Sequence, residues 1–191
     1  MKAFVTAPFS LEALEELKKL LKDEVIYESW LDTNTVYFKA EDLVEKIKNS
    51  GAEVYICEGD NVKKDVIENV NLKIIGSTRG DPNNIEIETA TKKGIPVLHA
   101  PGRNTIAVAE MTIAVMLALM RKIYKVERIL HSDQFKVEDF ADYVKYYNKF
   151  KGNELEGKTI GIVGLGRIGF EVAKRLKAFE VNFLIYDPYV Q

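Results

Sequence analysis

Residues 159–169 read Thr-Ile-Gly-Ile-Val-Gly-Leu-Gly-Arg-Ile-Gly and decide the fold of the C-terminal part of the chain. The apolar run at 158–163 predicts a buried strand, and the glycines that follow have the spacing Gly-x-Gly-x-x-Gly. A second β-rich run, residues 181–186, ends in Asp187, about 20 positions after the glycines. Glycine spacing alone is a weak indication, but strand, glycine turn, helix, strand and acid in this order are typical of a dinucleotide-binding β-α-β unit.

Each position of the glycine turn has a chemical reason. Gly164 allows the tight turn out of the strand, Gly166 leaves room for a pyrophosphate to approach the backbone, and Gly169 lets the helix pack close to the strand. The helix N-terminal amides, chiefly those of Arg167 and Ile168, would face the phosphates. The alternative is a glycine-rich turn that binds no ligand.

The residues around this turn refine the prediction. An amphipathic helix is expected after it, and Asp187 can accept hydrogen bonds from the ribose hydroxyls. Because this carboxylate would repel a 2′-phosphate and no Arg occurs in 188–191, the sequence favours NAD over NADP. Glu180 stands where a left-handed glycine cap is usual. The helix residues expected to face inward are Ile168, Val172, Ala173, Leu176 and Phe179.

Residues 1–103 alternate between two periods. Helical spacing of apolar residues separates the short β-rich runs, which implies a parallel sheet covered by helices on both faces. We therefore expect a small doubly wound α/β domain. Ser10 and Asn61 are the expected helix N-caps, and Gly51 and Gly94 the expected C-terminal stops. The expected strands are 2–6, 25–30, 53–57, 72–76 and 95–99.

A single long helix is predicted from Asn104, as its N-cap, to about His131. Its first half is apolar nearly all round, so we expect it to be buried between domains or subunits. Residues 132–157 carry aromatic residues at helical spacing and are expected to form a helix-containing connector. A stacking surface for single-stranded nucleic acid is disfavoured, because no basic groove accompanies these aromatics.

Composition excludes several classes of protein. The 191 residues are 47% apolar and 29% charged with a net charge of −2, which gives no long-range attraction to nucleic acid or anionic membranes. No signal peptide or membrane span is visible, and no Cys/His spacing suggests a metal site. Cys57 is the single cysteine, so no internal disulfide is possible and a reducing, cytoplasmic setting is favoured. We expect its side chain to be buried.

Three stretches, 75–85, 94–110 and 154–169, resemble the D-isomer-specific 2-hydroxyacid dehydrogenases, the family of phosphoglycerate dehydrogenase and glyoxylate reductase. The resemblance implies a flavodoxin-like substrate domain at 1–103. It also implies the first part of a Rossmann NAD-binding domain at 104–191. In the family, the long helix usually supports a homodimer.

The resemblance also assigns residues. The loop at Arg79 and Gly80 corresponds to the family loop whose backbone amides hold the substrate carboxylate. Arg79 is an unusual side chain there, and a surface turn arginine is the alternative. Val108 corresponds to the position that contacts the nicotinamide end, with simple core packing as the alternative.

The family's catalytic Arg, Glu and His have no counterpart here, because they come from the second half of the nucleotide domain. We therefore expect a piece of a longer protein, without catalytic residues and inactive alone, whose strand at 158–163 has an open edge. We expect neither His99 nor His131 to be catalytic, and His131 to cap a helix C-terminus.

The function implied for the parent protein is hydride transfer between NAD and a small 2-hydroxy or 2-keto acid. The alternative is a dehydrogenase-like binding protein that senses NAD without turnover. Oxidation of NADH with a 2-keto acid would distinguish the two.

Overall fold

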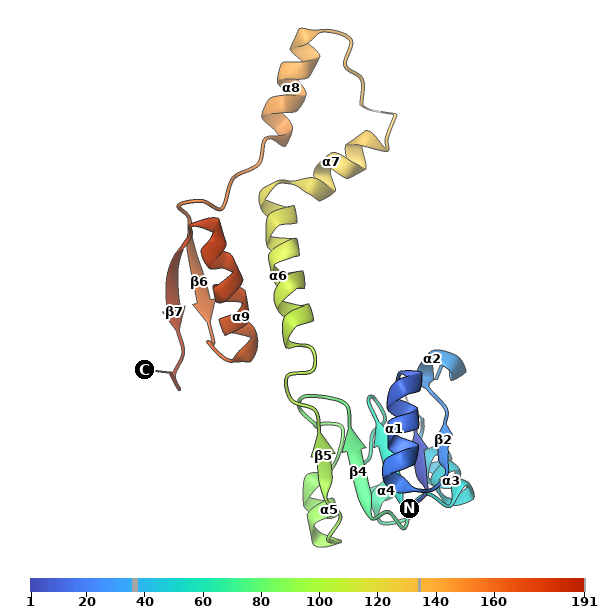
Figure 1. Ribbon diagram of the computed structural model, residues 1–191. Helices are drawn as coiled ribbons and strands as arrows, with labels where there is room; N and C mark the ends of the chain where they lie inside the picture. Colours follow the sequence, from blue (N-terminus) through green and yellow to red (C-terminus); the bar gives the residue numbers. More distant parts are fainter. Residues whose placement is uncertain (36–37, 134, 191) are drawn as a thin grey trace. The chain divides into compact units, whose positions relative to one another are not determined.

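The computed structural model describes residues 1–35, 38–133 and 135–190 (Figure 1). The chain divides into two compact units, residues 1–103 and 104–191. None of the described helices has the length and apolar character needed to cross a membrane.

The first unit contains a five-stranded parallel sheet with the order β2-β1-β3-β4-β5. This order is that of flavodoxin-like doubly wound sheets, so the predicted fold class is confirmed. The strands are β1 (Ala3–Val5), β2 (Val25–Tyr27), β3 (Val54–Cys57), β4 (Ile74–Ser77) and β5 (Val97–His99). The helices are α1 (Leu11–Leu21), α2 (Trp30–Thr33), α3 (Ala40–Ser50), α4 (Lys64–Ile67) and α5 (Ile87–Lys92).

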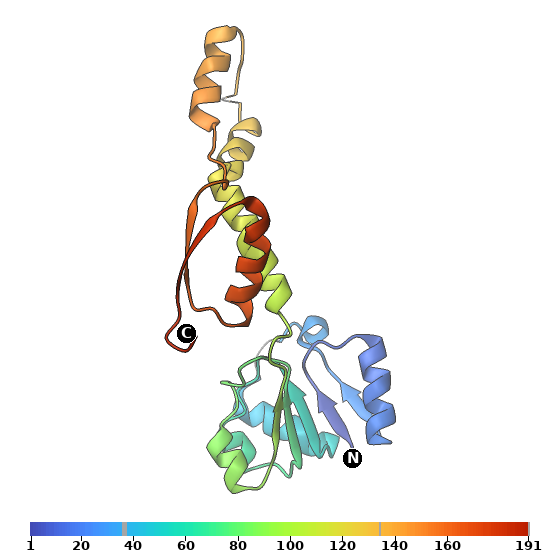
Figure 2. The same cartoon turned by 60° about the vertical axis from the view of Figure 1, so that its left-hand side comes forward.

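Both faces of this sheet carry helices, as the alternating pattern predicted (Figures 1 and 2). Ala3 and Val5 pack with α1 residues on one face, whereas Phe4 of the same strand packs with α3, α4 and α5 on the other. The cause is the strand's period of two, which sends successive side chains to opposite faces. Cys57 is fully buried, as expected, and burial raises the pKa of its thiol to about 12.

Local signals located some helix ends correctly. The Ser10 hydroxyl accepts from the Ala13 amide at 3.2 Å, and Gly51 ends α3 in the left-handed region at φ +65°. The expected cap at Asn61 is wrong, because Val62 is still extended in a parallel bridge to Ile85 and α4 begins only at Lys64. The expected strand 25–30 is also too long. It stops at Tyr27, and Ser29 caps α2 through a bond from the Leu31 amide.

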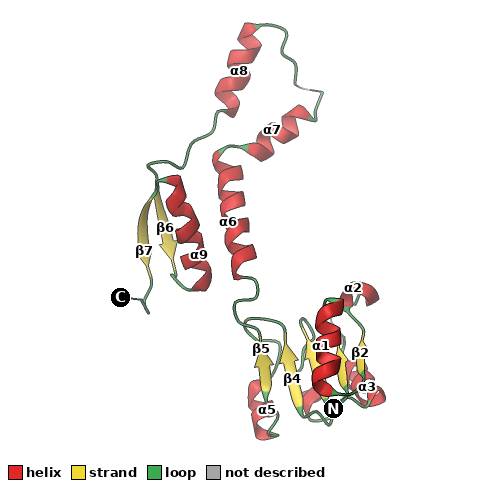
Figure 3. Ribbon diagram, in the orientation of Figure 1, coloured by secondary structure: helices red, strands yellow, loops and turns green. Residues whose placement is uncertain are grey.

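The second unit combines helices with a two-stranded parallel sheet, shown by secondary structure in Figure 3. The strands β6 and β7 pair from Thr159 opposite Asn182 to Val163 opposite Tyr186. Helix α6 packs along α9, and the buried core between them includes Ile113, Val172 and Leu176 (Figure 2). The elements are α6 (Thr105–Met120), α7 (Ile123–Leu130), α8 (Phe140–Phe150), β6 (Thr159–Val163), α9 (Arg167–Leu176), the 3₁₀ turn η1 (Lys177–Phe179) and β7 (Asn182–Tyr186).

The prediction of one helix over 104–131 is wrong, because the chain breaks between α6 and α7 at Lys122, whose φ is +55°. The returning chain causes this break. The Asn153 amide donates to the Met120 carbonyl at 2.9 Å, and a Cβ on Gly152 would lie 2.7 Å from the Arg121 Cα. Asn104 stands at the N-cap position of α6 but makes no side-chain cap bond there.

Burial in the second unit is lower than the apolar pattern suggested. Only two residues of α6 are buried, and Met111 is 64% exposed. Strand β6 is not buried within the chain, since Val163 is 86% exposed and no described strand pairs with its other edge. Ile168 and Phe179 are more than a third exposed, against expectation. Ile168 lies in the first turn of α9, beyond the end of β6, and Phe179 follows the change to three residues per turn in η1.

Candidate functional site

The glycine turn joins the end of β6 to the start of α9. Gly164 adopts φ +90°, a left-handed conformation that favours glycine, and its amide donates to the Tyr186 carbonyl at 2.8 Å. A Cβ on Gly169 would lie 2.2 Å from the Gly164 carbonyl oxygen, so only glycine permits this close packing. At Gly166, by contrast, a Cβ would meet nothing within 4 Å. The turn is therefore tightly packed on its inner side and open on its outer side.

The open side presents backbone donors. Within the described residues, the amides of Gly166, Arg167 and Ile168 donate to no other protein group, and Gly166 provides no side-chain cap. These amides begin a ten-residue helix, whose dipole adds partial positive charge at this end. The turn therefore has the electrostatics and the clearance that a phosphate group requires.

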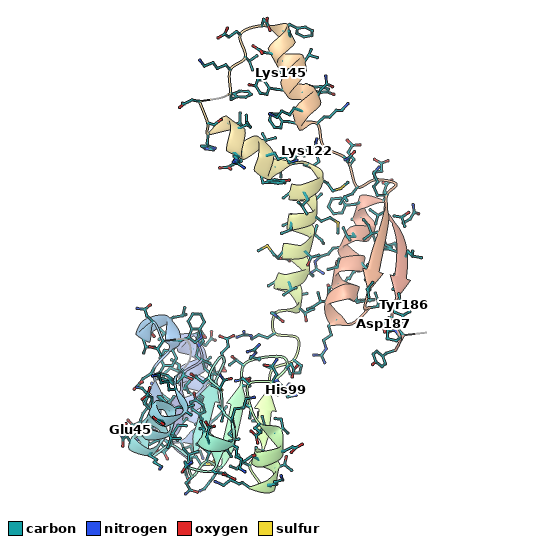
Figure 4. The ribbon with its side chains drawn as sticks, turned by 180° about the vertical axis from the view of Figure 1, so that it is seen from behind. Glu45, His99, Lys122, Lys145, Tyr186 and Asp187 are labelled. Carbon is teal, nitrogen blue, oxygen red and sulfur yellow. The ribbon has the colours of Figure 1, made fainter. Side chains whose placement is uncertain are left out.

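Asp187 stands directly after β7, next to the turn (Figure 4). Its Oδ2 accepts from the Leu165 amide at 2.5 Å, and its Oδ1 accepts from the Tyr189 amide at 2.8 Å. Hydrogen bonds from the amides of Tyr189, Leu165 and Val190 lower the pKa of this carboxyl group below its ordinary value. The structure thus joins the acid to the glycine turn, with the anionic form favoured.

The loop at Arg79 and Gly80, predicted to hold the substrate carboxylate, follows β4 at the carboxyl edge of the first unit's sheet. The Arg79 carbonyl accepts from the Ala100 amide at 2.9 Å, and the Gly80 carbonyl contacts the His99 Nδ1 atom at 2.9 Å. The amides of Gly80 and Asp81 donate to no other described residue. Two consecutive free amides on an exposed loop can donate hydrogen bonds to a carboxylate.

A buried polar cluster beside this loop was missed by sequence reasoning. Asp60 is only 3% exposed, and its Oδ2 accepts from Thr6 Oγ1 at 2.7 Å and Tyr55 OH at 2.8 Å. Its carbonyl accepts from the Asn84 side chain at 2.9 Å. Burial raises the pKa of Tyr55 well above its ordinary value. The available signal was the occurrence of polar residues just after two apolar strands, where the loops of a parallel sheet meet.

The other predicted residues occupy simpler settings. Val108 is half-buried on α6, and its carbonyl accepts from Thr112 Oγ1 at 2.7 Å. His131 caps the C-terminus of α7, as expected, with its amide donating to the Glu127 carbonyl at 3.1 Å. The described part of the chain contains no group of three or more His, Cys, Asp or Glu side chains that could hold a metal ion.

Parallel strands joined by a glycine turn, with an acid at the end of the second strand, define a dinucleotide-binding β-α-β unit. Residues 113–191 match the family model described as the D-isomer specific 2-hydroxyacid dehydrogenase, NAD binding domain. Over residues 113–191, the chain thus matches the NAD-binding domain of this family of dehydrogenases.

Relatives are similar over most or all of the chain. It is 40% identical to D-3-phosphoglycerate dehydrogenase of Archaeoglobus fulgidus, spanning 100% of this chain and 33% of that protein. It is 38% identical to glyoxylate reductase of Pyrococcus horikoshii, spanning 88% and 49% respectively. The crystal structure of NAD⁺-bound 3-phosphoglycerate dehydrogenase of Entamoeba histolytica is 28% identical, with a TM-score of 0.70, over 100% of this chain and 55% of that one. The chain thus spans half or less of the length of these curated relatives.

Proposed function

We propose that the glycine turn of this chain binds NAD. The free amides of Gly166, Arg167 and Ile168 would hold the pyrophosphate, while Gly164 and Gly169 shape the turn. Asp187 would accept hydrogen bonds from the ribose hydroxyls and reject the 2′-phosphate of NADP. The observation that supports this proposal best is the hydrogen bond from the Leu165 amide to the Asp187 carboxylate, because it holds this acid next to the glycine turn.

We further propose that the protein containing this chain is an oxidoreductase acting on a small 2-hydroxy or 2-keto acid. Bound NAD would supply the hydride acceptor or donor. Residues 1–103 would form the substrate domain, with the free amides at Gly80 and Asp81 binding the substrate carboxylate and Arg79 beside it. Residues 104–191 would begin the nucleotide domain, with Val108 toward the nicotinamide.

We propose that the acid–base groups of this reaction lie outside these 191 residues, because the chain spans half or less of the length of these curated relatives. The exposed apolar residues of α6 support a homodimer formed through this helix, because an uncovered stripe of this kind marks an interaction surface. We propose the cytoplasm as the compartment, in keeping with one buried cysteine. The exposed α6 residues include Ile106, Met111, Val115 and Leu119.

Two assays test this function. The chain should bind NADH more tightly than NADPH in calorimetric titrations. The longer protein should oxidise NADH with glyoxylate, hydroxypyruvate or 3-phosphohydroxypyruvate, while the chain alone should not. NADH binding without turnover on a broad 2-keto acid panel would instead favour an NAD-sensing protein, and turnover by the chain alone would show that it holds its own catalytic groups.

A further inference from the structure

The loop that carries Arg79 is held in place by the protein on both sides. At its start, the Thr78 amide donates to the Cys57 carbonyl at 3.0 Å and the Arg79 amide to Ser77 Oγ at 3.3 Å. At its end, the buried Asn84 side chain donates to the Asp60 carbonyl at 2.9 Å. The position of the Arg79 backbone is therefore fixed before any ligand binds.

The Arg79 side chain is a cation that has no counter-ion among the described residues. It is half-buried, and its guanidinium forms no ion pair or hydrogen bond with any residue that the structure describes. Two neighbouring cations are occupied, since Arg103 pairs with Glu58 and Lys63 donates to the Asn83 carbonyl at 2.9 Å. A half-buried guanidinium has lost part of its hydration, so a charge-assisted hydrogen bond to a bound anion would compensate for that loss.

The edge of the sheet at which the Arg79 charge lies is also indicated. Ser77 at the end of β4 pairs with Cys57 at the end of β3, so the loop that carries Arg79 leaves the carboxyl edge of the sheet. The Arg79 charge also acts on Cys57, lowering the pKa of this thiol against the larger effect of burial. The guanidinium therefore acts at the carboxyl edge of the sheet, the edge that carries the free amides of Gly80 and Asp81. The Asp81 carboxylate is exposed, so solvent screens its charge.

We propose that Arg79 determines substrate specificity by binding a second anionic group, so that the preferred substrates are 2-hydroxy or 2-keto acids with an additional carboxylate or phosphate. This proposal rests on the proposed function, because the amides of Gly80 and Asp81 must hold the first carboxylate. Arg79 and Gly80 are consecutive, so the Arg79 side chain starts from the same loop as the free amides, and we infer that a ligand of three or four carbons with two anionic groups contacts both.

Amide chemical-shift titrations of the ¹⁵N-labelled chain test this inference with two matched pairs of ligands. D-malate is compared with D-lactate, and 3-phospho-D-glycerate with D-glycerate, at constant ionic strength. In each pair, the ligand with the second anionic group should bind at least about fivefold more tightly than its monoanionic partner, with shifts at Gly80 and Asp81. The two pairs distinguish a carboxylate from a phosphate as the second group.

Arg79→Gln should abolish the preference, because it should weaken binding of the ligands with a second anionic group more than binding of their monoanionic partners, and Arg79→Lys should keep part of the preference. Lys92→Gln, which removes an exposed cation on α5, is the matched control and should change neither affinity. Equal binding of both members of each pair, or a preference that survives Arg79→Gln, would overturn the role of Arg79 alone. Absence of shifts at Gly80 and Asp81 with all four ligands would overturn both this role and the proposed carboxylate site.

Discussion

Replacing Gly166 with Ala separates cofactor binding from folding. The Gly166 backbone has φ −67° and ψ −171°, which is open to any residue, and a Cβ there would meet nothing within 4 Å. The methyl group would therefore stand in open space, on the side where a pyrophosphate must approach. We expect the variant to fold with unchanged or slightly raised stability, since Gly→Ala at a compatible site gains about 0.4–1 kcal/mol.

The expected loss of NADH affinity follows from the hydrogen bonds at stake. A hydrogen bond to a charged group contributes about 1.5–3 kcal/mol, and tenfold in affinity corresponds to about 1.4 kcal/mol. Displacing the phosphate from one or two amides should therefore raise the dissociation constant by about 10- to 100-fold or more. Isothermal titration with NADH and thermal unfolding of the same samples measure both quantities.

Gly161→Ala is the matched control for this experiment. A Cβ at Gly161 also meets nothing within 4 Å, but this glycine lies inside β6 rather than in the turn. The control should keep both its stability and its NADH affinity. A folded Gly166→Ala variant that binds NADH as tightly as the parent chain would refute the assignment of the turn as the pyrophosphate site.

Three further predictions concern the same two sites. Gly169→Ala places a Cβ 2.2 Å from the Gly164 carbonyl oxygen, so the free energy of unfolding of the second unit in urea should fall by about 1–3 kcal/mol. Unchanged stability would contradict the close packing of the turn. Backbone hydrogen bonds lower the pKa of Asp187 in the folded chain, so the contribution of this carboxylate to stability is complete above its ordinary pKa and is lost as the pH falls through the lowered pKa. Asp187→Asn should remove this pH dependence in acid titrations followed by circular dichroism. An identical titration profile in the variant would exclude a stabilising role of the Asp187 carboxylate. Asn84→Ala leaves the Asp60 carbonyl without its hydrogen-bond donor and should lower the free energy of unfolding in urea by about 1–3 kcal/mol. The amide chemical-shift changes at Gly80 on addition of a carboxylate ligand should also be weaker. Unaltered stability and shifts would show that Asn84 does not position the loop.

The features that the sequence predicted correctly have local causes. The glycine turn was predictable because its glycines and the strand before them lie together in residues 159–169. The parallel pairing of β6 with β7 follows from the β-α-β connection that this turn begins. The doubly wound sheet was predictable because strand and helix periods alternate along residues 1–103.

The features that were missed depend on contacts distant in sequence. The break between α6 and α7 is imposed by Asn153, more than 30 residues beyond Met120. The Asp60 cluster joins Thr6, Tyr55 and Asn84 from separate loops and strands, and periodicity does not show how deeply polar residues are buried. The exposure of α6 and β6 could not be predicted from the sequence pattern either. An apolar pattern indicates that a face favours burial, but it does not show which surface buries that face.

Amide shifts of the ¹⁵N-labelled chain on addition of NAD⁺ test most directly whether the turn after β6 is the dinucleotide site. We expect saturable shifts that are largest at residues 165–169 and next to Asp187, and weaker effects from NADP⁺ at equal concentration. Shifts confined to other segments, or none at millimolar NAD⁺, would contradict it.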